Sequence, residues 1–167
     1  MKIIKLNTSL VLVVCIIFTA SFSSYSQSQD LSGWEKTDLP WLTFYKPTYL
    51  VKTEYEGTDS AVWEYEGKNI NLNIEVGLYA GKYDVDQEEK YYSKKSVEID
   101  SKKAEIVTFK FRKASSKLEY IAILYFNEIG SENSKMSFTA YCKTAEEREI
   151  AKKIFYSIKF KNKVEDK

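Results

Sequence analysis

The 167-residue chain contains no histidine. This absence excludes Ser-His-Asp and Cys-His nucleophile systems, most zinc sites and the usual general base at neutral pH. The chain also has only two cysteines, two prolines and six glycines. So little proline and glycine argues against collagen-like, linker-rich or low-complexity architecture. No glycine-rich phosphate loop is present either.

The first 26 residues have the pattern of a secretory signal. Lys2 and Lys5 give a positive start, and Leu10–Ala20 is apolar apart from one threonine. Ser24 and Ser26 place small side chains at the two positions that a signal peptidase reads. We therefore expect cleavage after Ser26 and export to the periplasm or the extracellular space.

Two alternatives for this segment are less favoured. A retained membrane anchor would need about 20 apolar residues, more than this run supplies. Lipidation at Cys15 would need a small residue before the cysteine, whereas Val14 is bulky. We therefore expect no stable membrane span after cleavage.

The chain that remains after cleavage is nearly neutral. Loss of two lysines leaves 23 basic and 24 acidic residues, a net charge of −1. Such a balance provides no electrostatic attraction for nucleic acid, so we expect no nucleic-acid partner. Only Cys142 survives, and one cysteine forms no internal disulfide. Stability must therefore come from an apolar core, which this length allows.

Hydrophobic periodicity predicts an antiparallel sheet. Residues 70–78 alternate apolar and polar side chains, which is typical of a strand with one buried face. Residues 118–129 are apolar on both faces, which predicts a strand in the middle of a sheet. Asp100, Ser101 and Lys102 are typical of a tight hairpin turn. The charged stretch 84–95 favours a short helix beginning near residue 86.

The end of the chain has the strongest helix signal. Thr144 and Glu147 match a capping box. An apolar stripe at helical spacing follows, made of Ile150, Ala151, Ile154, Phe155 and Ile158. The sequence predicts an α+β fold: a central antiparallel sheet of about six strands, with this helix packed on it and the short helix in mid-chain. We expect a flexible lead-in at 27–38, one domain at 39–160 and a frayed tail at 161–167.

Several segments resemble the PsbP-like and DcrB-like secreted domains. They are Tyr45-Lys46-Pro47, the hairpin from Val97 to Ala104, the long strand after it, and the closing segment from Ile154 to Phe160. The resemblance covers roughly residues 39–160. It implies a central antiparallel sheet flanked by helices, and it implies no reaction. One departure is Ser101, which stands where the family usually has glycine.

No residue of the sequence stands out as catalytic, cofactor-binding or metal-binding. Cys142 alternates with other apolar residues in a strand, so core packing is favoured over a nucleophile. The acids Asp84, Asp86, Glu88 and Glu89 would suit calcium, but they lack the pattern of a known calcium loop. A solvated turn is the favoured interpretation. The 24 acidic residues make close carboxylate pairs common by chance, so none can be singled out.

Aromatic residues are the remaining candidates for a binding site. Trp63 and Tyr65 alternate in a strand, which favours the core. Tyr83, Tyr91 and Tyr92 lie in an irregular stretch, and binding residues gather on such segments. We therefore expect a non-catalytic envelope module that binds a protein or small ligand through these tyrosines. The alternatives are a carboxylate-dependent hydrolase of the glycosidase type and an immunity protein against an envelope toxin.

Overall fold

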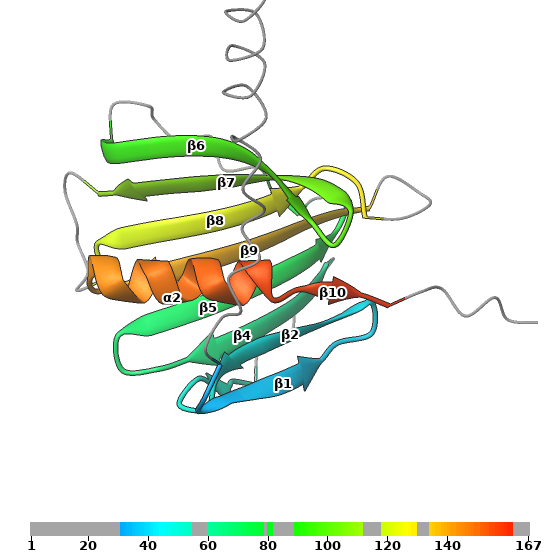
Figure 1. The fold of residues 1–167 in the computed structure, drawn as a ribbon, viewed down its shortest axis with the longest axis horizontal. Helices are drawn as coiled ribbons and strands as arrows, with labels where there is room; N and C mark the ends of the chain where they lie inside the picture. The colour runs from blue at the N-terminus through cyan, green and yellow to red at the C-terminus, as the bar shows by residue number, and fades with distance from the viewer. Residues whose placement is uncertain are drawn as a thin grey trace, which may run out of the picture. The chain divides into compact units, whose positions relative to one another are not determined.

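The computed structural model describes residues 31–54, 60–78, 80–81, 89–111, 118–129 and 134–161. A small antiparallel sheet has the order β1-β2-β10, and a seven-stranded antiparallel sheet has the order β3-β4-β5-β9-β8-β7-β6 (Figure 1). The elements are β1 (Trp34–Asp38), β2 (Leu42–Pro47), β3 (Val51–Lys52), β4 (Ala61–Glu66), β5 (Ile70–Gly77), β6 (Lys90–Ile99), β7 (Lys102–Lys110), β8 (Tyr120–Phe126), β9 (Lys135–Cys142), α2 (Ala145–Tyr156) and β10 (Lys159–Phe160).

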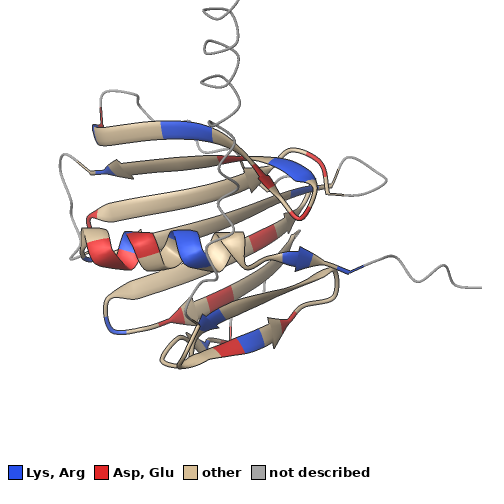
Figure 2. Cartoon of the chain, viewed as in Figure 1, with Lys and Arg blue, Asp and Glu red and all other residues tan. Residues whose placement is uncertain are grey.

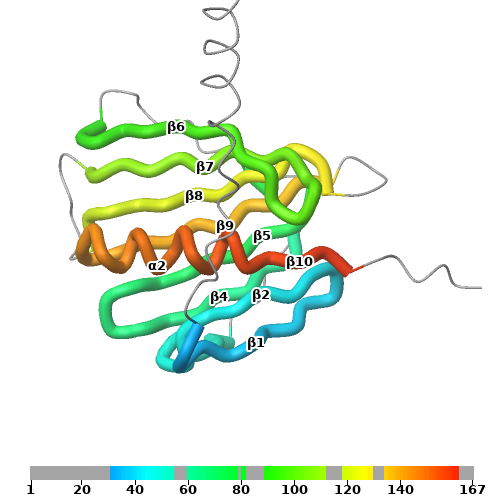
Figure 3. Tube along the Cα trace, viewed as in Figure 1, coloured from blue at the N-terminus to red at the C-terminus, as the bar shows by residue number. Residues whose placement is uncertain are grey.

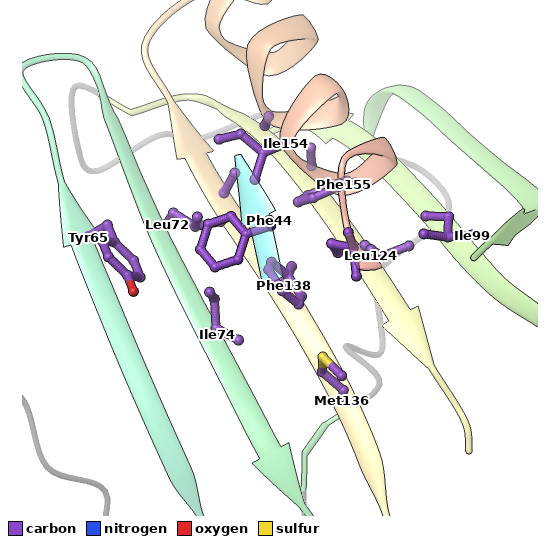
Figure 4. Packing of buried hydrophobic residues seen from close by; sticks show 14 of the residues in the cluster. Phe44, Tyr65, Leu72, Ile74, Ile99, Leu124, Met136, Phe138, Ile154 and Phe155 are labelled. Carbon is purple, nitrogen blue, oxygen red and sulfur yellow. The ribbon is translucent and has the colours of Figure 1, made fainter. Parts of the chain in front are cut away.

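One face of the large sheet, called here the first face, carries the main core. Helix α2 contacts β8, β9 and β2. A series of edge-to-face ring contacts joins the layers: Tyr65 to Phe44 at 5.9 Å, Phe44 to Phe138 at 5.7 Å, and Phe138 to Phe155 at 6.1 Å between centroids (Figure 4). Each such pair adds about 0.5–1.5 kcal/mol beyond the area it buries. These contacts join the small sheet, the large sheet and the helix.

Strand β5 shows why the apolar residues alternate. Ile70, Leu72, Ile74 and Val76 are buried in the first-face core, whereas the residues between them are half-buried. Successive side chains of a strand point to opposite faces. The polar residues therefore lie on the opposite face, called here the second face. There the Asn73 side-chain amide donates to Glu64 at 3.2 Å.

Strand β8 is buried on both of its faces. Its residues Ile121 to Phe126 are all buried, and the strand lies between β7 and β9. A second apolar cluster forms on the second face around Phe109, Ile121 and Ile123. The prediction that this stretch forms an interior strand is confirmed. β5 and β8 thus differ because the second face is polar near β5 and apolar near β8.

The β6–β7 hairpin turns at Asp100 and Ser101. Both have positive φ angles, 48° and 64°. Two left-handed residues in a two-residue loop are typical of a type I′ turn. Ser101 thus takes the left-handed conformation that glycine adopts most easily, so the departure from glycine leaves a tight turn in place. The Asp100 carboxylate accepts from the Phe160 N–H at 2.7 Å and the Lys159 Nζ at 3.0 Å, which attaches the hairpin to β10 (Figure 3).

Helix α2 begins as the capping box predicts. The Glu147 N–H donates to the Thr144 hydroxyl, and the Thr144 N–H donates to the Glu147 carboxylate at 2.8 Å. Ala151, Ile154 and Phe155 are buried against the sheet. With 12 residues, α2 is short, and no helix in the described part of the chain is long and apolar enough to cross a membrane.

The structure corrects three expectations. The large sheet has seven strands, not about six, and its short edge strand is Val51–Lys52. The predicted mid-chain helix is wrong: residues 90–95 belong to β6, where pairing with β7 overrides the local charge pattern. Residues 84–88 lie outside the described residues. The polar lead-in is also shorter than expected, since residues 34–38 form β1 by pairing with β2.

Candidate functional site

Tyr91 and Tyr92 lie where β6 departs from regular pairing. Lys90 pairs with Lys110 and Ser93 with Thr108, so the two tyrosines both face the single residue Phe109. Two residues opposite one constitute a β-bulge. The third predicted site residue, Tyr83, lies outside the described residues.

The bulge sends the two tyrosines to different environments. Tyr92 is half-buried and packs against the second-face cluster of Phe109, Ile121 and Ile123. Tyr91 is 73% exposed and has a φ of 56°. A bulky residue at this φ is an outlier, and the left-handed conformation costs about 1–2 kcal/mol for a residue with a Cβ. The structure therefore separates two neighbours that the sequence analysis grouped together.

Strand β6 is rich in lysine and forms one edge of the large sheet. Lys90, Lys94 and Lys95 are exposed, and Figure 2 shows the blue stretch on this strand. Lys94 makes an ion pair with Glu105 of β7 at 2.8 Å. Lysine on an edge strand commonly opposes unwanted pairing. The described part of β6 near Tyr91 thus carries three exposed lysines, one of them ion-paired with Glu105.

A hollow of about 600 Å³ lies toward the other end of β6. It is lined by Ser96, Val97, Glu98, Lys103, Ala104, Glu105, Tyr125 and Asn127. The Tyr125 hydroxyl donates to the Asn127 side-chain oxygen at 3.3 Å. Burial, and then the charge of Glu105, raise the pKa of Tyr125. The phenol therefore stays protonated at neutral pH.

Glu98 and Glu105 are a carboxylate pair that the sequence alone did not single out. In the hairpin register Glu98 faces Lys103 and Glu105 faces Ser96, so the two acids are diagonal neighbours. The Cα atoms of such neighbours are about 7–8 Å apart, so their carboxyl groups can reach the separation that glycosidases use. Glu105, however, is held by the Lys94 ammonium. That ion pair favours the charged carboxylate, which suits the nucleophile or base of a glycosidase, so Glu98 would have to supply the proton.

Cys142 is buried at the end of β9. Burial, then the charge of Glu147, raise the pKa of its thiol to about 12, with Arg148 acting in the opposite direction. A thiol rather than a thiolate is therefore present at neutral pH, and thiols are poor nucleophiles. Its role in core packing is confirmed.

A smaller hollow of about 440 Å³ lies near the start of α2. Tyr49, Lys68, Asn69, Ile70 and Glu147 line it. Glu147 is already engaged in the helix cap. Burial raises the pKa of Tyr49, and the charge of Glu147 adds to that effect. This arrangement contains no acid–base pair free for catalysis among the residues that line it.

The acidic cluster that was considered for calcium lies mostly outside the described residues. Asp84, Asp86 and Glu88 lie outside them, and the structure describes only Glu89. Across the described ranges, no group of three or more histidine, cysteine or acidic side chains is placed to hold a metal ion.

Lys46 is a buried charge that sequence reasoning missed. Its ammonium contacts the Glu35 carboxylate and the Leu50 carbonyl, and lies 5.3 Å from the Tyr65 ring centroid. Burial, with the charge of Glu35, raises the pKa of Tyr65 to about 12. Lys46 thus links β1, β2 and β4. Its only signal in the sequence was its place in the Tyr45-Lys46-Pro47 segment.

Comparison with solved structures identifies the architecture. The solution structure of cyanobacterial PsbP (CyanoP) from Synechocystis sp. PCC 6803 matches with a TM-score of 0.53 and 10% sequence identity, covering 84% of this chain and 99% of that chain. The chain has a PsbP-like fold. The resemblance seen in the sequence is therefore confirmed at the level of architecture, and this PsbP-like domain shares the fold alone with that relative.

A second match is weaker. A crystal structure from Bacteroides thetaiotaomicron VPI-5482 has a TM-score of 0.48 and 13% identity, covering 78% of the PsbP-like chain and 50% of its own. No protein-family model and no curated protein matches the sequence. What this PsbP-like domain does must accordingly be argued from its own residues.

Proposed function

We propose that the protein is an exported, non-catalytic module that binds another protein through the exposed surface around Tyr91 on β6. The supporting observation is the conformation of Tyr91. Its backbone is in a strained region, yet the residue is 73% exposed. Strained residues persist where the surrounding structure holds them, and they cluster at functional sites.

A protein fits this surface better than a small ligand does. Small molecules bind in concave sites, and Tyr91 lines neither of the two hollows described above. An aromatic ring on an open edge is instead typical of protein contacts, where tyrosine is enriched. The lysines beside it favour a partner with acidic groups. An immunity role would be one form of this activity.

The hydrolase alternative is less well supported. Glu98 and Glu105 share a hollow, and the Lys94 ion pair suits Glu105 as the charged carboxylate, so Glu98 would have to be the proton donor. Glu98, however, is exposed, whereas the acid of a glycosidase lies in a shielded pocket. We therefore propose that the module has no catalytic activity.

Export rests on residues 1–26, which lie outside the described residues, so it remains a proposal from the signal pattern. The N-terminal sequence of the recovered protein tests it directly. A protein that begins near residue 27 in the envelope or medium supports export. An intact N-terminus in the cell interior contradicts it.

Site-specific photocrosslinking tests the binding surface. A photoreactive phenylalanine at position 91 should form adducts in producing cells. The same residue at position 156 is the matched control, because Tyr156 is also an exposed tyrosine, 44% exposed, on α2. Adducts at position 91 alone support the proposal. Equal labelling at both positions, or none at either, contradicts it.

A further inference from the structure

The smaller hollow near the start of α2 is formed by three segments that are distant in the sequence. Tyr49 comes from the loop between β2 and β3, Lys68, Asn69 and Ile70 from the β4–β5 turn and the start of β5, and Glu147 from the first turn of α2. Figure 1 shows the β4–β5 turn and the start of α2 at the same end of the large sheet. The volume of about 440 Å³ lies within the range of small-molecule sites, about 300–1,000 Å³.

Backbone hydrogen bonds hold two of these segments together. The Gly67 N–H donates to the Ile70 carbonyl at 2.9 Å, which closes the β4–β5 turn. The Lys143 N–H donates to the Asn69 carbonyl, also at 2.9 Å, and Lys143 directly precedes the N-cap of α2. The turn and the helix are therefore fixed relative to each other. A preformed site loses less conformational entropy when a ligand binds.

The wall formed by Tyr49 is fixed as well. The Leu50 N–H donates to the Pro47 carbonyl at 3.1 Å, which makes a tight loop around Tyr49. A Cβ atom at Gly67 would lie 2.9 Å from Leu50 Cδ2 and 3.2 Å from Tyr49 Cδ2. Glycine, which has no Cβ, allows this close approach. The Tyr49 ring thus packs against the β4–β5 turn on one side, although the residue is 51% exposed.

The lining of the hollow contains one cationic and one anionic side chain. Lys68 is exposed and makes no ion pair within the described part of the chain. Glu147 is half-buried, and the Thr144 N–H and hydroxyl both donate to its Oε2. Among the described residues this leaves Glu147 Oε1 to accept from a further donor.

These two charges select the class of ligand. A ligand with negative charge alone would be repelled by Glu147, and one with positive charge alone would be repelled by Lys68. A ligand that carries both charges can satisfy both side chains. The Tyr49 ring and Ile70 add apolar surface that a hydrocarbon group can cover. Amino acids and short peptides with free ends combine these three features.

We propose that this hollow binds a small zwitterion of the amino-acid type, with its carboxylate on the Lys68 ammonium, its ammonium on Glu147 Oε1 and its apolar part against the Tyr49 ring. Both polar contacts are charge-assisted hydrogen bonds, which are the stronger kind. The Tyr49 phenol provides a further donor: burial, and then the charge of Glu147, raise its pKa, so it stays protonated at neutral pH. The hollow shares no residue with the surface around Tyr91.

Calorimetric titration of the purified protein with L-leucine and with leucyl-leucine tests the site and distinguishes a free amino acid from a peptide. We expect saturable binding of at least one of them, with a Kd at or below about 1 mM. N-acetyl-leucine lacks the ammonium and leucinamide lacks the carboxylate. Each should bind about tenfold more weakly than leucine, because each loses one charge-assisted hydrogen bond.

A lysine variant locates the site on the protein. Lys68→Gln should weaken binding about tenfold and leave the fold unchanged in circular dichroism, because the side chain is exposed. Lys153→Gln is the matched control, since Lys153 is an exposed lysine in the last turn of the same helix, and it should not change the affinity.

Three results would overturn the proposal. They are no binding of either ligand up to about 10 mM, equal binding of leucine and its two singly charged derivatives, and an affinity unchanged by Lys68→Gln. None of them bears on the proposed function, because crosslinking at position 91 tests that surface separately.

Discussion

Leu72 and Asn73 are neighbours on β5, yet their side chains lie on opposite faces of the large sheet. Leu72 is buried in the first-face core, whereas Asn73 is half-buried and bonded to Glu64. The first face is apolar from β4 to β7 because α2 and the small sheet lie over it. The second face is apolar only around Phe109, Ile121 and Ile123. The alternation of apolar and polar side chains along a strand thus reflects what packs on each face of the sheet at that strand.

Exchanging the residue types at positions 72 and 73 should give the largest difference in unfolding free energy between two variants. Leu72→Asn removes a buried side chain and places an amide in the first-face core, which should cost about 4 kcal/mol or more of unfolding free energy. Asn73→Leu should change it by less than about 1 kcal/mol, because that side chain is half-exposed. Urea denaturation measures both. Similar costs at the two positions would contradict the distinction between the faces.

Substitutions of the α2 N-cap residue test how much the cap stabilises the helix that covers the first face. Thr144→Ala removes the oxygen that accepts from the Glu147 N–H, and should lower the unfolding free energy by about 1 kcal/mol. Thr144→Ser retains a capping hydroxyl and should lower the unfolding free energy by at most a few tenths of a kcal/mol. Thermal denaturation of the two variants gives the comparison. An alanine variant as stable as the serine variant would show that the cap is dispensable.

The attachment of the hairpin to β10 should depend on pH. Burial acts to raise the pKa of Asp100, but the Phe160 N–H and Lys159 outweigh it, so the pKa lies below its ordinary value near 3.8. A lowered folded-state pKa stabilises the fold above the unfolded-state value, and this contribution is lost as the pH falls through the folded-state pKa.

Asp100→Asn tests this contribution, because asparagine also tolerates the left-handed conformation. We expect a loss of up to about 1 kcal/mol at pH 7, since the carboxylate is partly exposed. The difference between the two proteins should shrink as the pH falls below about 3.8. Denaturation curves at pH 7, 4 and 2.5 measure it. A difference that is constant with pH would exclude the charged contact as its cause.

The smallest expected effect concerns the exposed bulge. Tyr91→Gly relieves the left-handed strain, whereas Tyr91→Ala keeps it and removes the same ring. The glycine variant should therefore be more stable than the alanine variant by up to about 1 kcal/mol, partly offset by its greater unfolded-state entropy. Both should lose partner binding. A glycine variant clearly less stable than alanine would show that Tyr91 is unstrained.

The crosslinking experiment uses position 91 rather than position 92 for a structural reason. Tyr92 packs on the second-face cluster. Its replacement would disturb folding as well as binding, and the two effects would be difficult to separate. The same binding role was predicted for both residues, because neither the bulge nor the direction of each ring can be read from the sequence.

Local patterns in the sequence determined much of this fold. Period-two alternation identified β5, β8 and β9, and the hydroxyl at Thr144 with the acid at Glu147 identified the start of α2. These signals are legible because strand alternation and helix capping depend on residues a few positions apart. The burial of Cys142 followed from the same alternation, since its neighbours at every second position are apolar.

Pairing between distant segments was decided only by the tertiary structure. Residues 90–95 have the charges expected of a solvated helix, but they form an edge strand because their backbone pairs with β7. Residues 34–38 are polar, yet they pair with β2. The bulge at Tyr91, the burial of Lys46 and the contact of Asp100 with Phe160 likewise depend on partners remote in sequence. The sequence of one segment does not specify which distant strand will satisfy its backbone hydrogen bonds. The pairing with that distant strand determines where Tyr91, and with it the candidate binding surface, lies.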